Sequence, residues 1–165
     1  MIRRPNLEDI ETLARIQVQA WDETYRGLLP DCEIAARDPT FRRALWPKLI
    51  ANPDLRIAYA PNVGFAVMGQ QRDAPLAAQG YHEELNSLYV LKTKQGRGIG
   101  RALLAAVADQ QAFTALMVSG NHRAGAFYLA SGAVLLDQRE VTEGDLTFQE
   151  DVYGWSSEQA SAIVA

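Results

Sequence analysis

Three glycines within six residues mark the part of the sequence best suited to binding a ligand. Residues 95–100 read QGRGIG, three residues after the apolar run 88–91 and at the start of a stretch with helical spacing. Glycine lets the backbone turn tightly and lets a ligand approach the N–H groups. The helix dipole and the side chains of Arg97 and Arg101 would add attraction for an anion. The sequence therefore predicts a phosphate-binding loop here.

The spacing separates this loop from two other kinds of phosphate-binding loop. In the dinucleotide pattern G-x-G-x-x-G counted from Gly96, Arg101 takes the place of the last glycine. In the Walker pattern the final glycine is followed by Lys and then Ser or Thr, whereas Gly100 is followed by Arg101. The pattern that fits is Q-x-x-G-x-G, at Gln95, Gly98 and Gly100. A connector without a ligand is the alternative, because so short a pattern also arises by chance.

A second group of residues suited to chemistry follows the next apolar run. Asn121 and Tyr128 lie in the segment NHRAGAFYLASG, residues 121–132. Together with the loop upstream, the order and spacing of these residues resemble the GNAT superfamily of N-acetyltransferases. The resemblance is specific over residues 84–132.

The wider resemblance spans residues 2–155 and departs from the common pattern at three places. Lys92 stands where a proline often follows the strand, and Ala133 stands where phenylalanine is frequent. Residues 100–116 form a shorter stretch than usual. We expect the shorter stretch either to shorten the helix or to shift the register of the next strand.

The resemblance implies transfer of an acetyl group from acetyl-CoA, as cosubstrate, to a primary amine by direct attack in a ternary complex. It implies an α/β fold with a mixed, mostly antiparallel central sheet, helices on both faces and a splayed strand pair at the CoA site. No metal is required. The residues implied in binding the cosubstrate are Leu88, Tyr89, Val90, Gln95, Gly96, Arg97, Gly98, Ile99, Gly100, Arg101 and Asn121.

By the same resemblance Tyr128 acts as the general acid and Glu84 as the general base. A phenol of pKa about 10 stays protonated at neutral pH and can donate to a departing thiolate. The amine must lose a proton before it attacks, which Glu84 would accept directly or through water. Two alternatives stay open: Tyr128 as a tyrosine at the edge of the core, and Glu83, His82 or a water chain as the base.

The acceptor amine would contact a segment near the N-terminus, WDETYRGLLP at residues 21–30, which is similar to one found in a widespread group of these enzymes. Trp21 and Tyr25 are the candidate contacts, and the carboxylates of Asp22 and Glu23 suit a cationic amine. The alternative is that both aromatic side chains belong to the core.

The composition restricts the class of protein. With 165 residues, 48% of them hydrophobic, the chain is expected to form a single domain over residues 1–165. Cys32 is the only cysteine, which excludes an internal disulfide and fits a cytoplasmic protein, and Cys32 with two histidines is too little for a structural zinc site. The net charge of −4 disfavours nucleic acid as a partner, and no apolar run is long enough for a membrane span. Whether the chain forms a homodimer stays open.

The periodicity predicts alternating helices and strands around these residues. Asn6 is the expected cap of the first helix, and Gly132 is expected to end the helix that carries Tyr128. The expected helices are 7–20, 40–52, 99–111 and 124–131, and the expected strands are 2–4, 55–60, 63–69, 83–91, 116–119, 134–142 and 146–155.

Two other functions remain compatible with the residues. A regulatory or interaction module could bind CoA without catalysis, and an α/β domain could use the glycine loop as a plain connector. Only the enzyme would release free thiol when an amine is added to acetyl-CoA. Only the α/β domain with a plain connector would show no stabilisation by CoA.

Overall fold

The computed structural model describes all residues from Met1 to Ala165. The chain forms two compact units, each assembled from two separate stretches of sequence. The first unit contains Met1–Met68 and Ser87–Val107, and the second contains Gly69–Asn86 and Ala108–Ala165. The single domain expected over residues 1–165 stays a prediction.

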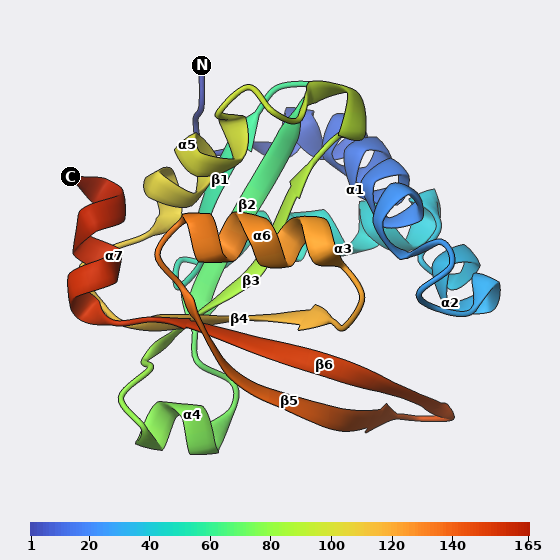
Figure 1. Cartoon of the computed structure of the whole chain (residues 1–165). Coiled ribbons are helices and arrows are strands. Elements are labelled where there is room, and N and C mark those ends of the chain that lie inside the picture. The colour runs from blue at the N-terminus through green and yellow to red at the C-terminus, as the bar shows by residue number, and fades with distance from the viewer. The chain divides into compact units, whose positions relative to one another are not determined.

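Six strands form one sheet in the order β1-β2-β3-β4-β6-β5 (Figure 1). The β3–β4 pair is parallel, whereas the β1–β2, β4–β6 and β5–β6 pairs are antiparallel. This confirms the α/β fold with a mixed, mostly antiparallel sheet. The strands are β1 Arg56–Ala60, β2 Gly64–Gln70, β3 Glu83–Val90, β4 Phe113–Val118, β5 Val134–Glu143 and β6 Leu146–Trp155.

The first unit begins with a capped helix. Asn6 and Asp9 form the two halves of a capping box around the short 3-10 helix Leu7–Asp9, which leads directly into α1, Ile10–Tyr25. The cap was expected, but the helix continues five residues beyond the predicted end at Ala20. No glycine or proline occurs between Asn6 and Gly27, so nothing in residues 21–25 stops the helix.

The core of the first unit lies between α1, the helix α3 (Pro39–Ala51) and the strands β1 and β2. Trp46 of α3 is fully buried, meets Phe65 edge to face at 4.8 Å, and donates its indole N–H to Gln17 at 2.9 Å. That hydrogen bond satisfies a buried donor that would otherwise cost free energy. A short helix, α2 (Asp31–Ala36), precedes α3 and was not predicted.

The second unit is built on the long hairpin of β5 and β6, which Figure 1 shows in orange and red. Phe113 of β4 stacks on Trp155 of β6 with ring centroids 4.4 Å apart, and both side chains are fully buried. Residues 113–115 were not expected in a strand, yet their pairing with β6 begins at this stacked pair. The helices of this unit are α4 Ala74–Ala78, α6 His122–Ala130 and α7 Ser157–Val164.

Strand β3 changes the edge toward which its backbone groups point. At its start the N–H of Glu83 donates to the carbonyl of Ala112, just before β4. Just past its end the N–H of Leu91 donates to the carbonyl of Val63, just before β2. Regular alternation would direct residues 83 and 91 to the same edge, because they are an even number of residues apart. The strand therefore departs from regular alternation in between.

The parallel ladder between β3 and β4 is short. It joins Glu83, Glu84 and Leu85 to Phe113, Thr114 and Ala115, while β3 continues to Val90 and β4 to Val118. The strand pair is thus hydrogen-bonded over its first three residues. The splayed strand pair that the resemblance implies stays a prediction.

Candidate functional site

The predicted glycine loop leads into helix α5, Ile99–Val107. Gly96 and Gly98 have φ values of +76° and +77°, which glycine adopts without strain. The first N–H of the helix to bond back to the loop is that of Ala102, which donates to the carbonyl of Gly98 at 3.0 Å. The N–H groups of residues 99–101 precede that bond and have no intrahelical acceptor. The loop therefore offers the donors that an anion requires.

Gln95 connects the loop to strand β3. Its side-chain amide N–H donates to the carbonyl of Val90 at 2.8 Å. Its amide oxygen is buried and has no hydrogen-bond donor in the chain. Gln95 thus holds the loop against the end of the strand.

The backbone of β3 near its end is oriented by its neighbour β2. A Cβ added at Gly64 would clash with the carbonyl oxygen of Tyr89, so the Tyr89 backbone faces β2. By alternation the N–H and C=O groups of Leu88 and Val90 point to the opposite edge. Of these groups the carbonyl of Val90 is already bonded to Gln95.

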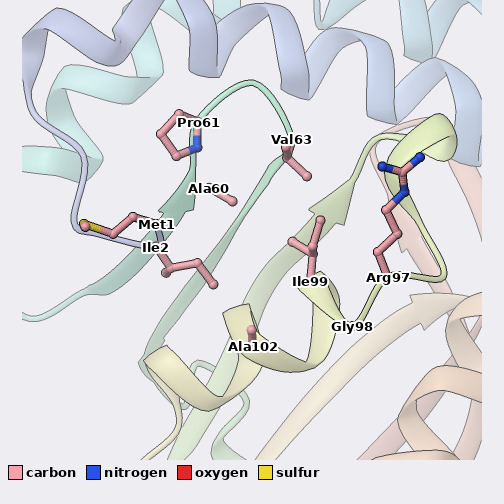
Figure 2. A pocket seen from close by; sticks show the side chains of 9 residues that line it. All are labelled: Met1, Ile2, Ala60, Pro61, Val63, Arg97, Gly98, Ile99 and Ala102. Carbon is pink, nitrogen blue, oxygen red and sulfur yellow. The ribbon is translucent and has the colours of Figure 1, made fainter.

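A largely apolar pocket flanks the loop. Figure 2 shows its wall with Met1 at one end and Arg97 at the other. The turn between β1 and β2 and the first turn of α5 supply most of the lining. The lining residues are Met1, Ile2, Ala60, Pro61, Val63, Arg97, Gly98, Ile99 and Ala102.

The predicted acceptor contacts lie at the end of α1, in the same unit as the loop. The rings of Trp21 and Tyr25 are 4.5 Å apart, and both side chains are half-buried. The hydroxyl of Tyr25 lies 3.1 Å from that of Tyr89, and burial raises the pKa of Tyr25. The structure therefore links the acceptor segment to the strand expected to bind the cosubstrate.

The two carboxylates expected to attract a cationic amine are engaged within the chain. Asp22 forms an ion pair with Arg26 one helical turn later. Glu23 accepts hydrogen bonds from the backbone N–H of Lys92 at 2.9 Å and from Gln19 at 2.9 Å. Both carboxylates therefore already have partners.

Two arginines that the sequence did not single out lie beside Trp21. The guanidinium carbons of Arg37 and Arg42 are 4.7 and 4.9 Å from the centre of the Trp21 ring. Arg42 is only 4% exposed, and burial lowers its pKa to about 10, so it remains a cation at neutral pH. Nothing in the spacing of α3 distinguishes Arg42 from its exposed neighbour Arg43.

Glu84 lies in the second unit, where it is buried on β3. Arg72 donates to both of its carboxylate oxygens, at 2.7 and 3.2 Å. This bidentate pair raises the pKa of Arg72 and was not expected. Of the other candidate bases, Glu83 is half-buried and His82 is exposed.

Asn121 and Tyr128 lie in the same unit as Glu84, on helix α6. The side-chain oxygen of Asn121 caps the helix by accepting from the N–H of Ala124 at 3.3 Å. Tyr128 is 7% exposed, with its ring 5.5 Å from Tyr153 and 5.4 Å from Trp155. Two aromatic residues of β6 thus pack against the ring of Tyr128.

Comparison with known sequences decides the family. The profile of the Acetyltransferase (GNAT) domain matches residues 55–132. The uncharacterised N-acetyltransferase YuaI of Bacillus subtilis is 30% identical over 126 residues, covering 71% of this chain and 69% of YuaI. The chain belongs to the GNAT family of N-acetyltransferases. It is accordingly a GNAT-type enzyme, as the glycine loop and the segment around Tyr128 indicated.

Solved structures of other proteins share the fold. The PaiA N-acetyltransferase of Thermoplasma acidophilum, solved with coenzyme A, is 21% identical with a TM-score of 0.66, covering 92% of this chain and 96% of PaiA. YncA of Salmonella typhimurium, solved with acetyl-CoA, is 17% identical with a TM-score of 0.64, covering 95% of this chain and 93% of YncA. The smu.2055 protein of Streptococcus mutans is 19% identical with a TM-score of 0.69, covering 95% of this chain and 99% of that protein.

None of the helices in this GNAT chain has the length and apolar character needed to cross a membrane.

Proposed function

We propose that this chain transfers an acetyl group from acetyl-CoA to the primary amine of a small molecule or peptide, by direct attack in a ternary complex. The observation that carries the proposal is the glycine loop, with backbone donors exposed at the start of α5. The solved relatives PaiA and YncA, which share the fold, bind coenzyme A and acetyl-CoA. Pyrophosphate is the group in this cosubstrate that suits such a loop.

The loop residues and β3 have complementary parts in holding the cosubstrate. The N–H groups near Gly98, Ile99 and Gly100 would bind the pyrophosphate, with Arg97 and Arg101 as exposed cations beside them. The backbone groups that Leu88 and Val90 direct away from β2 would pair with the pantetheine amides, in the manner of an added strand. Asn121 would hold the same arm.

Tyr128 is proposed as the general acid. Attack of the amine nitrogen on the thioester carbon forms the amide bond and breaks the carbon–sulfur bond, so the sulfur leaves as a thiolate that requires a proton. A buried phenol can supply it because it is protonated at neutral pH. The aromatic contacts with Tyr153 and Trp155 restrict the ring to one orientation, which favours proton transfer along a fixed path.

Glu84 is proposed as the general base. Its carboxylate would accept the proton that the amine must lose, directly or through water. The bidentate hydrogen bonds from Arg72 occupy both oxygens of this carboxylate. Arg72 has a largely exposed side chain, at 69%, so a bound substrate could reposition it.

Acetyl-CoA and a library of amines, with detection of free thiol, test the proposal directly. We expect thiol release only when both an amine and acetyl-CoA are present, and an acetylated amine by mass spectrometry. Stabilisation by CoA without thiol release from any amine would favour a binding module over an enzyme. Absence of both stabilisation by CoA and thiol release would contradict the proposed CoA site.

Substitution of Tyr128 tests its role. Tyr128→Phe removes only the hydroxyl, so we expect kcat to fall by about 100-fold or more while the affinity for CoA stays unchanged. Tyr81→Phe is the matched control, because Tyr81 is half-buried in the same unit and has no proposed role. Equal turnover of Tyr128→Phe and wild type would exclude Tyr128 as the acid.

A further inference from the structure

Arg42 is the one buried cation of the first unit for which the chain supplies no counter-ion. It is 96% buried, and its Nε and Nη2 atoms have no hydrogen-bond acceptor. Burial of a charged group is costly unless the group is paired and hydrogen-bonded. The position therefore requires a compensating partner that the chain itself does not contain.

The aromatic residues around Arg42 compensate for its charge only in part. Its guanidinium carbon lies 4.9 Å from the centre of the Trp21 ring and 5.4 Å from that of Phe41. Aromatic faces attract a cation, but they supply no oxygen for its N–H donors. Arg37, on the same Trp21 ring at 4.7 Å, adds a second positive charge rather than a negative one. The cluster around Trp21 is thus electropositive.

Two other arginines of the chain show what the Nε and Nη2 donors of a guanidinium bind. Arg43 uses Nε and Nη2 to hold both oxygens of Glu11 at 2.7 and 2.8 Å. Arg72 uses the same two atoms to hold both oxygens of Glu84. These parallel donors match the geometry of a carboxylate. In Arg42 the equivalent pair of donors lacks such a partner.

Arg42 lies next to a residue predicted to contact the acceptor, because its guanidinium packs against Trp21. Trp21 and Tyr25 are the proposed acceptor contacts, and the Tyr25 hydroxyl meets that of Tyr89 on the strand proposed to bind the cosubstrate. Phe41 is exposed and Trp21 is half-buried, so the rings that cover Arg42 border solvent. For an acceptor to reach the guanidinium, these rings would have to shift.

We propose that the acceptor carries a carboxylate in addition to its amine, and that Arg42 binds this carboxylate through Nε and Nη2, assisted by Arg37. This inference rests on the proposed acetyltransferase activity and specifies its substrate class as amino carboxylates. The ion pair between Asp22 and Arg26 offsets one of the two carboxylates in this segment.

Matched pairs of acceptors test the proposal. The probes are the common amino acids, β-alanine and γ-aminobutyrate, each compared with the amine that lacks the carboxylate, and aminoethyl phosphate as an acceptor with another anion. We expect at least one amino carboxylate to exceed its matched amine in kcat/KM by about 30-fold, as loss of a buried charged hydrogen-bond partner implies. The same amino carboxylate should raise the melting temperature of the enzyme.

Substitution then assigns the preference to Arg42. In Arg42→Met the ratio of the two kcat/KM values should fall close to one, and the rise in melting temperature with the amino carboxylate should disappear. Arg43→Met, one residue along α3 and exposed, should retain both. Circular dichroism establishes that each variant is folded.

The outcomes separate this inference from the activity on which it rests. Thiol release with amines but no preference for a carboxylate would overturn the inference and leave the acetyltransferase proposal standing. A preference that Arg42→Met retains, or a stronger preference for aminoethyl phosphate, would also overturn it. Thiol release from no acceptor would instead count against the proposed function, and binding of the amino carboxylate by the wild type alone would then still support the role of Arg42.

Discussion

The hydroxyl groups of Tyr25 and Tyr89 lie 3.1 Å apart and join the end of α1 to strand β3. The ring of Tyr89 also contacts Phe65 of the core at 5.7 Å. The hydrogen bond therefore fixes the end of α1, where the proposed acceptor contacts lie, relative to a strand whose position the core determines. Its loss should affect acceptor binding more than cosubstrate binding.

We predict that Tyr25→Phe raises the KM of the acceptor several-fold and leaves the KM of acetyl-CoA unchanged. The free energy of unfolding should fall by about 1 kcal/mol, the usual net value of one hydrogen bond. Tyr89→Phe should have a similar effect, and the double variant should be no worse than either single one, because both remove the same bond. Additive losses would show that the two hydroxyls act independently.

The glycine loop gives a second prediction. Gly98→Ala places a Cβ at a φ of +77°, where nothing lies within 4 Å, so the cost is backbone strain of about 1–2 kcal/mol rather than a clash. Because the strain shifts the loop backbone, we expect the KM of acetyl-CoA to rise by about tenfold. Gly80→Ala is the control, since Gly80 has a φ of +96° and equally open surroundings outside the loop. Equal effects on KM would contradict the proposed role of the loop.

The buried pair of Glu84 and Arg72 gives a third prediction. If Glu84 accepts the amine proton, Glu84→Gln should lower kcat by about 100-fold and remove the decline of the rate toward acidic pH. If the carboxylate serves only as the partner of Arg72, the substitution should lower the melting temperature and leave the shape of the pH profile intact. His82→Asn, at an exposed position next to this strand, serves as the comparison. A pH profile that changes only in His82→Asn would assign the base to His82.

Arg42 gives a prediction about stability in the absence of ligand. Replacement of an uncompensated buried charge by an apolar side chain of similar length is expected to be neutral or stabilising, by about 1 kcal/mol or more. We therefore expect Arg42→Met to unfold at the same urea concentration as the wild type or a higher one. Arg43→Met should leave the urea midpoint nearly unchanged, because its ion pair with Glu11 is exposed. Marked destabilisation by Arg42→Met would indicate an internal partner.

Asp9 gives a prediction about pH. Its hydrogen bonds from Arg3, at 2.7 Å each, hold the pKa of Asp9 below its ordinary value. Because the pKa is lower in the folded state, the stabilisation is complete above the unfolded pKa of about 3.9 and is lost as the pH falls through the folded value. Asp9→Ala also loses half of the capping box, so at pH 7 we expect a loss of about 1 kcal/mol in urea unfolding.

The acid dependence distinguishes the ion pair from the cap. The gap between wild type and Asp9→Ala should narrow as the pH falls below about 4, because the wild-type carboxyl then becomes protonated. Asp54→Asn, at an exposed position, should show no such gap at any pH. A gap that stays constant down to pH 3 would mean that the charge of Asp9 contributes nothing.

Local patterns predicted much of the fold. The capping residues Asn6 and Asp9, the turn at Asn62 with its positive φ of 61°, and Gly132 after α6 all act through neighbouring residues, so the sequence reveals them. The ends of α5 and β4 were misjudged. Helix α5 ends at Val107 rather than at 111, and β4 begins at Phe113 rather than at 116, because residues 113–115 pair with the distant strand β6. Such pairing leaves no local signal.

The residues of the candidate site also differ in whether a local pattern reveals them. Gln95, Gly98 and Tyr128 are recognisable because their spacing is the signal. Arg72 and Arg42 cannot be recognised in this way. Arg72 contacts Glu84, which is 12 residues away in the sequence, and Arg42 contacts Trp21, which is 21 residues away. The sequence indicated that the carboxylates of Asp22 and Glu23 suit a cationic amine. In the structure Asp22 pairs with Arg26, and Glu23 accepts from the backbone N–H of Lys92, which lies beyond β3.

The chain passes between its two units three times, after Met68, Asn86 and Val107. A truncation after Val107 would remove the proposed acid and keep every residue of the first unit, but residues 69–86 would then lack the rest of the second unit. Strand β3 would lose the partner of its first three residues, because β4 begins at Phe113. Strand β3 contributes residues to both units, so removal of either unit leaves this strand without part of its pairing.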